Sequence, residues 1–310
     1  MKKFDKNNLI VAKVDENDLM SFLVKMDIDD NGNPMFPLEN LSKEIVNVIP
    51  EYVFADHIDQ SIPLTDITDR LREAASAIYK IRDYDLVYKA VVQNDAAAQA
   101  ELDKSPYLKR GEFGELLLHM ILRDFKNTVP LISKVYFKDS SSVPAHGFDA
   151  VHVSPDDGIL WLGESKLYND GRLGVKALAE DLAHHLRTDY LNEQFAIIMK
   201  NLNNGSIPQR KEWIEKLSSA SRLADKLNFI NIPMLCIYGH DIYSKFADTM
   251  RQDAADYHEL NVRELKSYFD ACNQNPLSDK CNVILMLLPI KNKKELVKAL
   301  HLKLFAMQNI

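Results

Sequence analysis

Residues 146–153, HGFDAVHV, and residues 159–166, ILWLGESK, flank the short segment 154–158, SPDDG. The two outer segments are rich in β-forming residues and the middle one is rich in turn formers. This pattern predicts an antiparallel β-hairpin. The second segment is apolar on both of its faces, which is typical of a strand inside a sheet rather than at its edge. The predicted hairpin therefore forms the centre of the fold, and the rest of the chain is interpreted around it.

The hairpin predicts a pair of neighbouring carboxylates. If the turn is centred between Asp156 and Asp157, Asp149 lies opposite Glu164. Opposed residues point to one face, with Cβ atoms about 4.5–5.5 Å apart. Lys166 lies two residues further along and shares that face. Two aliphatic pairs are expected there as well, namely Val151 with Leu162 and Val153 with Leu160.

Two adjacent carboxylates at the end of an apolar strand repel each other and resist ionising together. A divalent cation between Asp149 and Glu164 would relieve this repulsion, and carboxylate oxygens suit Mg²⁺ or Mn²⁺. Such an ion can polarise a phosphodiester and activate water. A lysine beside it, here Lys166, can orient or deprotonate the water or stabilise the transition state. The sequence therefore predicts a metal-dependent site for phosphodiester hydrolysis.

The acidic-x-Lys triplet has little specificity alone, because it occurs three times, at residues 124–126, 164–166 and 264–266. The first and third triplets lie in helical periodicity, and only Glu164 ends an apolar strand that follows an aspartate in hairpin register. A plainer interpretation stays open, in which the hairpin is on the surface and Glu164 and Lys166 only pair with each other.

A helix is expected over residues 111–126, and Glu112, Glu115 and His119 form one stripe along it. The stripe is interpreted either as the solvated face of the helix or as a source of a third metal ligand. In the second case Glu115, or with less support Glu112, faces the carboxylate pair.

The remaining pattern predicts an α/β fold. From residue 111 the expected order is helix, three strands, helix, strand, helix and strand, which indicates a mixed sheet flanked by helices. Expected strands are 131–137, 148–153, 159–167, 194–199, 232–238 and 282–288; expected helices after the first are 173–190, 208–227, about 242–272 and one terminal amphipathic helix. The chain is divided into a mostly helical N-terminal region (1–100), a core (101–245) and a helical and strand C-terminal extension (246–310).

The composition excludes several classes of protein. The chain has 310 residues, 46% hydrophobic and 27% charged, which is typical of a soluble globular protein. Its three cysteines cannot form a four-sulfur zinc site. Neither a P-loop nor a dinucleotide-binding glycine motif is present. Without a secretory signal or an apolar run long enough to span a bilayer, the protein is expected in the cytoplasm and not in a membrane.

The helix glutamate, Asp149 and Glu164-Ser-Lys166 together resemble the PD-(D/E)XK nuclease superfamily over about residues 105–200. Phe148 occupies the place of the proline in the superfamily's name. More narrowly, the RGEFGE helix, Gly-Phe-Asp149 and the LGESKL strand resemble the HamA family, the nuclease subunits of the Hachiman anti-phage defence system. The resemblance implies a restriction-endonuclease-like core and a Mg²⁺- or Mn²⁺-dependent DNA nuclease. It implies that Asp149, Glu164 and Glu115 bind the metal and act with Lys166.

The same resemblance implies a separate helicase subunit, HamB, and a nuclease that is restrained until infection. Two other interpretations stay open: a non-catalytic subunit with a nuclease fold that docks on or regulates a helicase, and a nuclease that acts on RNA. The net charge of −7 argues against a protein that coats nucleic acid. We therefore expect weak DNA affinity for the isolated chain and delivery of DNA by a partner.

The helix after the motif strand adds weaker candidates. Lys176, His184 or Arg187 is in a position to contact the phosphate backbone, although a solvated helix face with one half-buried histidine is the favoured interpretation. His184 and His185 are adjacent and point about 100° apart, so the two cannot bind one metal ion.

Overall fold

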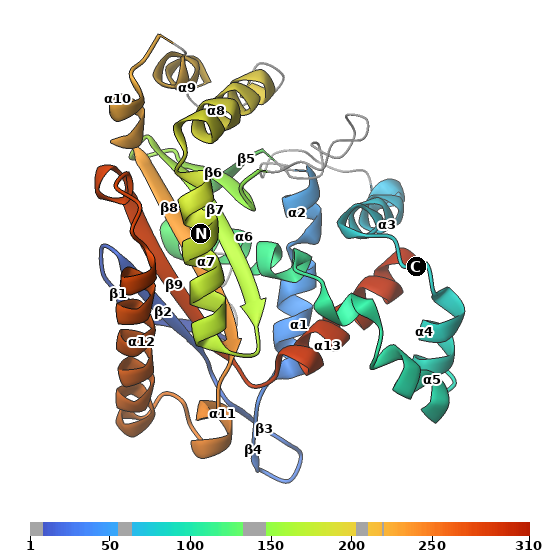
Figure 1. Cartoon of the computed structure of the whole chain (residues 1–310). Coiled ribbons are helices and arrows are strands. Elements are labelled where there is room, and N and C mark those ends of the chain that lie inside the picture. Colours follow the sequence, from blue (N-terminus) through green and yellow to red (C-terminus); the bar gives the residue numbers. More distant parts are fainter. Residues whose placement is uncertain (1–8, 55–63, 133–146, 203–209, 219) are drawn as a thin grey trace.

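The computed structural model describes residues 9–54, 64–132, 147–202, 210–218 and 220–310. Its centre is a seven-stranded sheet, flanked by helices (Figure 1). The spatial order is β1-β2-β9-β8-β7-β6-β5. The strands are β1 (Ile10–Asp15), β2 (Leu19–Val24), β5 (Val129–Ile132), β6 (Ala150–Ser154), β7 (Ile159–Tyr168), β8 (Ile230–Gly239) and β9 (Asn282–Ile290). A separate small hairpin pairs β3 (Asp27–Ile28) with β4 (Pro34–Met35).

The sheet is mixed, as the sequence predicts. Strands β2, β9, β8 and β7 run parallel to one another, whereas β1 pairs antiparallel with β2 and the β5-β6-β7 segment is antiparallel. Strands β8 and β9 are buried along almost their whole length. Burial on both faces is what the continuous apolar sequences of these strands require.

Helices cover both faces of the sheet. The helices are α1 (Leu38–Asn47), α2 (Ile49–Phe54), α3 (Ile67–Ile78), α4 (Tyr84–Val91), α5 (Ala96–Leu102), α6 (Glu112–Lys126), α7 (Gly171–His185), α8 (Thr188–Leu202), α9 (Arg210–Leu217), α10 (Leu223–Leu227), α11 (Ile242–Lys245), α12 (Gln252–Cys272) and α13 (Lys293–Gln308). Short 3₁₀ segments are η2 (Leu64–Asp66), η3 (Pro106–Lys109) and η5 (Ser278–Lys280).

Two apolar clusters define these layers. On one face, α1, α6 and α13 contribute Leu41, Leu116 and Leu300 to a cluster that includes Trp161 of β7. On the other face, α7, α8 and α12 pack against Leu162 and its neighbours. Each face of β7 therefore supports a different helix, with α6 on one side and α7 on the other.

The structure differs from the expected elements in several places. The expected helices 173–190 and 208–227 are each divided, the first between α7 and α8 and the second between α9 and α10. Residues 194–199 are not a strand but part of α8, so that prediction is wrong. Strands β1 and β2 were not expected, and they extend the sheet from within the N-terminal region that was predicted to be mostly helical. The expected strand over 131–137 overlaps β5, and its residues from 133 onward lie outside the described ranges.

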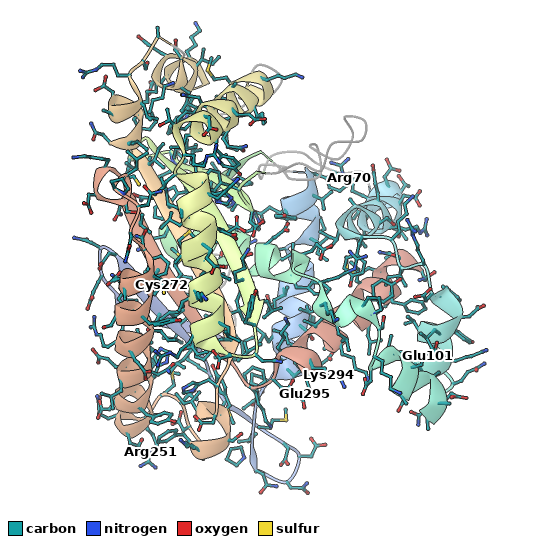
Figure 2. The ribbon with its side chains drawn as sticks, viewed as in Figure 1. Arg70, Glu101, Arg251, Cys272, Lys294 and Glu295 are labelled. Carbon is teal, nitrogen blue, oxygen red and sulfur yellow. The ribbon has the colours of Figure 1, made fainter. Side chains whose placement is uncertain are left out.

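The division of the chain at residues 100 and 245 stays a prediction. One sheet, however, takes strands from all three segments. The C-terminal helix also reaches the N-terminal region, where Lys303 of α13 forms an ion pair with Glu39 of α1. Just beyond that region, Lys294 and Lys298 form ion pairs with Asp103 at 3.2 and 2.8 Å. Figure 2 labels Lys294 and Glu101 near this junction.

Candidate active site

The hairpin forms in the predicted register. Val151 pairs with Leu162 and Val153 with Leu160, and the last pair before the site is Ala150 with Gly163. Gly158 closes the turn with a φ of +63°, a conformation that favours glycine. Asp149 follows the last pair and lies beside Glu164, as the sequence predicts.

Asp149 is buried and held in place by β7. Its Oδ2 atom accepts hydrogen bonds from the backbone N–H of Ser165 at 3.0 Å and from the Ser165 hydroxyl at 2.8 Å. Only 9% of Asp149 is exposed. Two donors to one oxygen fix the orientation of the carboxylate at the end of the hairpin.

Glu164 and Lys166 point to the α7 side of the sheet. Glu164 is 7% exposed, and its Oε1 atom accepts a hydrogen bond from Lys166 Nζ at 3.0 Å. Lys166 also forms an ion pair with Asp181 of α7. Burial of Glu164, followed by the charge of Asp149, raises the pKa of Glu164 to about 9, although Lys166 opposes this rise. Burial alone would lower the pKa of Lys166, but the charges of Glu164 and Asp181 raise it.

His185 is the site residue that sequence reasoning missed. Its Nδ1 atom lies 3.9 Å from Glu164 Oε2, and it has no hydrogen-bond partner within the part of the chain that the structure describes. The ring stacks on Tyr190 with centroids 4.9 Å apart and contacts Phe148. Burial lowers its pKa to about 4, so the imidazole is neutral at pH 7. The adjacent histidine pair was the available signal, but it was interpreted mainly as a helix face.

Two other candidates, Lys176 of α7 and Arg187 between α7 and α8, lie in local ion pairs. Lys176 lies 3.8 Å from Glu180, and Arg187 binds Asp189 at 2.7 Å. These contacts agree with the solvated helix face that the sequence favoured.

Glu115 and Glu112 have different partners. Tyr52 of α2 donates a hydrogen bond to Glu115 Oε2 at 2.7 Å, and the charges of Glu115 and Asp149 both contribute to a raised pKa of Tyr52, after the larger effect of burial. Glu112 instead binds Arg110 at 2.6 Å. Which of the two is the helix carboxylate of the site stays a prediction.

The expected stripe on α6 is not a solvated face. His119 is fully buried, with its Nδ1 atom 3.1 Å from His152 Nε2 of β6 and its ring in edge contact with Tyr52. Helix α2 from the N-terminal region packs against α6, and this long-range contact is invisible in the periodicity of α6 itself.

The donor chemistry suits a divalent cation. Asp149 and Glu164 supply two carboxylates. Burial, and after it the charge of Asp149, raises the pKa of Glu164, and a cation would compensate the charge that the two carboxylates share. Mg²⁺ in enzymes is commonly bound by one or two carboxylates, with water and substrate phosphate as the other ligands. Across the described ranges, no three His, Cys, Asp or Glu side chains gather into a metal-binding group. Glu115 as a third metal ligand therefore stays a prediction.

The other two acidic-x-Lys triplets lie on helices. Asp124 and Lys126 are at the end of α6, and Glu264 and Lys266 are on α12, where Glu264 is largely exposed and binds Arg172 at 2.9 Å. Only the triplet at residue 164 places its carboxylate in a buried strand, which separates it from its two sequence duplicates.

Within the described residues, none of the helices has the length and apolarity that a membrane span requires. A search of curated proteins finds no match for the chain. A model of the HamA family matches residues 2–304, which is nearly the whole chain and includes the hairpin, α6 and α7. The chain therefore belongs to the HamA family.

Proposed function

We propose that this protein is a Mg²⁺-dependent nuclease that hydrolyses phosphodiester bonds in DNA. The observation that carries the proposal is the buried Glu164, which lies beside the fixed carboxylate of Asp149 and is hydrogen-bonded to Lys166 at 3.0 Å. The PD-(D/E)XK resemblance also implies two acidic residues and a lysine at the ends of two paired strands.

Each residue has a distinct role in the proposed reaction. Asp149 and Glu164 would hold the cation, and Ser165 keeps Asp149 oriented through its hydroxyl and backbone N–H. Bound Mg²⁺ supplies Lewis-acid polarisation of the scissile phosphate. Lys166 Nζ would hydrogen-bond the attacking water or the charge that develops on the phosphate. Glu115 would assist from the α6 side.

Membership in the HamA family supports a role in Hachiman anti-phage defence. We propose that the nuclease acts there with a helicase subunit. Cleavage by the pair would then link strand opening by the helicase to hydrolysis by this chain. The rival role is a non-catalytic subunit that docks on or regulates the helicase.

The test is cleavage of plasmid DNA by the purified full chain, with and without its helicase subunit, in MgCl₂. We expect Glu164→Gln and Lys166→Met each to lower the cleavage rate by at least about 100-fold, the usual cost of losing a transition-state contact. EDTA should abolish cleavage by the unaltered chain.

Glu264→Gln is the matched control, because it neutralises the same residue type in a duplicate triplet on an exposed helix. This variant should cleave at the original rate. Cleavage that survives both Glu164→Gln and Lys166→Met contradicts the site. No cleavage by the unaltered chain under any of these conditions supports the non-catalytic role. Preferential hydrolysis of RNA in a parallel assay would show that the substrate is RNA, and the proposed site residues would stay the same.

A further inference from the structure

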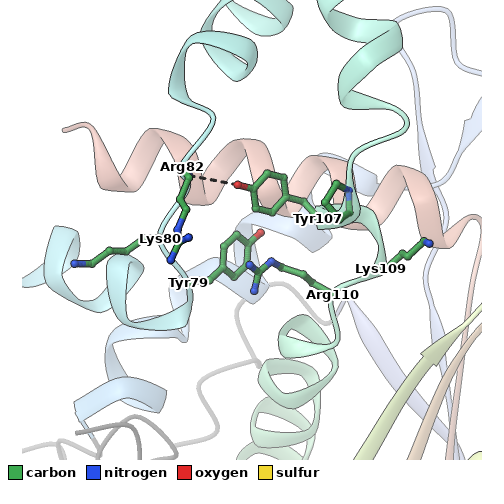
Figure 3. A pocket seen from close by; sticks show the side chains of 7 residues that line it. Tyr79, Lys80, Arg82, Tyr107, Lys109 and Arg110 are labelled. Atoms are coloured by element: carbon green, nitrogen blue, oxygen red, sulfur yellow. Dashed lines mark hydrogen bonds between the residues drawn. The ribbon is translucent and has the colours of Figure 1, made fainter. Parts of the chain in front are cut away.

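A second polar site lies outside the carboxylate cluster. It is a cavity of about 660 Å³ between the end of α3, η3 and the start of α6 (Figure 3). Its lining includes four cationic side chains and two tyrosines: Lys80, Arg82, Lys109, Arg110, Tyr79 and Tyr107. Four positive charges around one cavity are notable in a chain whose net charge is −7.

Most of this charge is not compensated by the chain. Arg110 binds Glu112 at 2.6 Å. The side chains of Lys80, Arg82 and Lys109 form no hydrogen bond or ion pair with any residue that the structure describes. Figure 3 shows the Arg82 and Arg110 side chains beside the tyrosines and the Lys80 and Lys109 side chains extending outward on either side. An anionic ligand would therefore be stabilised mainly by the guanidinium groups, and the lysines would add attraction at the rim.

The floor of the cavity is rigid. The Tyr79 ring stacks on His301 of α13. The Tyr79 hydroxyl also forms a hydrogen bond with the Nδ1 atom of His301 at 2.9 Å. The Tyr107 hydroxyl accepts a hydrogen bond from the backbone N–H of Arg82 at 3.4 Å. The Arg110 guanidinium lies 4.1 Å from the centre of the Tyr79 ring, and Figure 3 shows the two side chains against each other.

The tyrosines do not form a stacking platform for bases. Tyr79 and Tyr107 are each only 7% exposed. Arg110 lies over Tyr79, and His301 stacks on both rings. The accessible chemistry is therefore that of the ammonium and guanidinium groups, which bind phosphate oxygens without reading base identity.

The cavity lies next to the first turn of α6. Arg110 directly precedes Gly111, the residue that caps α6, and Glu115 lies in the first turn of that helix. At 1.5 Å per residue, about 6 Å of helix separates Gly111 from Glu115.

We propose that this cationic cavity binds the phosphodiester backbone of the nucleic acid substrate and so holds the strand on the enzyme. The inference rests on the proposed nuclease function, but it concerns binding and needs no cleavage. Contact through phosphates alone gives affinity without sequence preference.

The test compares two charge-reversal variants of the full chain that carry the same change in net charge. Lys80→Glu with Arg82→Glu alters the cavity, and Lys43→Glu with Lys280→Glu alters two exposed lysines elsewhere. Binding of fluorescently labelled single-stranded and duplex oligonucleotides is measured in EDTA at several low salt concentrations. Lys109→Glu provides a second, single variant of the cavity.

We expect the cavity variant to bind at least tenfold more weakly, with a salt dependence reduced by about two charges. The control should stay within about twofold of the original affinity. Equal affinity in both double variants overturns the proposal, even if Glu164→Gln abolishes cleavage. Loss of binding in the cavity variant supports it, even if no cleavage is found.

Two further results would also overturn it. If a mononucleotide saturates the cavity while the affinity for strands is unchanged in the variants, the ligand is a small phosphate compound. If only binding of the helicase subunit is lost, the cavity holds an acidic protein segment.

Discussion

Ser165 shows how one side chain can connect the fold to the site. Its hydroxyl and backbone N–H both bind Asp149 Oδ2, and the hydroxyl oxygen lies 3.0 Å from where a Cβ on Gly114 would be. The residue between the two motif positions is therefore in contact with a carboxylate on one strand and with α6. Its identity was not predicted to matter, because the motif leaves that position open.

We expect Ser165→Ala to weaken Mg²⁺ binding and to lower the stability of the fold. Loss of the hydroxyl leaves Asp149 with only the backbone donor, so the Mg²⁺ concentration for half-maximal cleavage should rise by about tenfold or more. The free energy of unfolding should fall by about 1–3 kcal/mol, because the lost hydrogen bond is buried and its acceptor is charged.

Ser154→Ala is the control for this variant. Ser154 lies in the same hairpin and accepts a hydrogen bond from Trp161 Nε1 at 2.9 Å. This hydrogen bond involves no atom of the site. The Ser154→Ala change should lower the free energy of unfolding but leave the Mg²⁺ dependence unchanged. An equal shift of Mg²⁺ dependence in both variants would show that Ser165 acts only through general stability.

Buried histidines predict loss of stability in acid. His258 of α12 is fully buried beside Ser21 of β2, with 3.0 Å between its Nε2 atom and the hydroxyl. Burial, then the charges of His240 and Lys13, lowers its pKa to about 4. Because the unfolded chain binds this proton near pH 6.5, the unfolded state gains stability as pH falls from about 6.5 towards 4.

The free energy of unfolding should therefore fall by up to about 2 kcal/mol per such histidine between pH 7.5 and 5. In His258→Gln, that pH-dependent loss should shrink by this amount, whatever the variant's stability at pH 7.5. Urea unfolding at the two pH values measures the difference. An unchanged pH dependence would mean that His258 is protonated equally in both states.

At the scale of elements, sequence patterns predict the structure correctly where the interacting segments are close in sequence. The hairpin register follows from the alternation in β6 and β7 and from the turn between them, so the positions of Asp149, Glu164 and Lys166 could be predicted. Residues 194–199 were misassigned because a short apolar run fits a buried strand or a buried helix equally well. In α8 the buried Leu191, Phe195, Ile198 and Leu202 follow helical spacing, which a six-residue window does not reveal.

The close contact of α7 with β8 gives a packing prediction. A Cβ on Gly174 would lie 2.5 Å from Cys236 Sγ, whereas a Cβ on Gly111 would meet nothing within 4 Å. We expect Gly174→Ala to lower the free energy of unfolding by about 1–3 kcal/mol despite the better helix propensity of alanine. Gly111→Ala should stay within about 0.5 kcal/mol of the original. Chemical denaturation compares the two; similar stabilities would mean that Cys236 moves aside at little cost.

At the scale of the whole molecule, the parts that sequence reasoning missed are those that depend on distant segments. Strands β1 and β2 join the sheet through β9, near the other end of the chain, and α2 buries the stripe of α6. His185 reaches Glu164 only because α7 packs over β7. Each of these contacts depends on tertiary packing, which the periodicity of a single segment does not reveal.

The shared sheet predicts that the core does not fold alone. A fragment of residues 101–245 would retain β8 but lose β9, its hydrogen-bonded parallel neighbour. Nearly every residue of β8 is buried in the whole chain, so the fragment would expose a long apolar edge. We expect the fragment to aggregate on expression, and the full chain to unfold in one cooperative transition by calorimetry. A monomeric fragment with a cooperative transition would instead support the division at 100 and 245.

The pairing of β2 with β9 also sets an order in time. Residues 19–21 are hydrogen-bonded to residues 285–287, so the β1-β2 hairpin has no partner in the sheet until the ribosome has released β9. Contacts between such distant segments form late in folding. A nascent chain holding the complete Asp149, Glu164 and Lys166 set still lacks the central strands β8 and β9 and helix α13. The acidic cluster thus reaches its final surroundings only after almost the entire polypeptide has been synthesised.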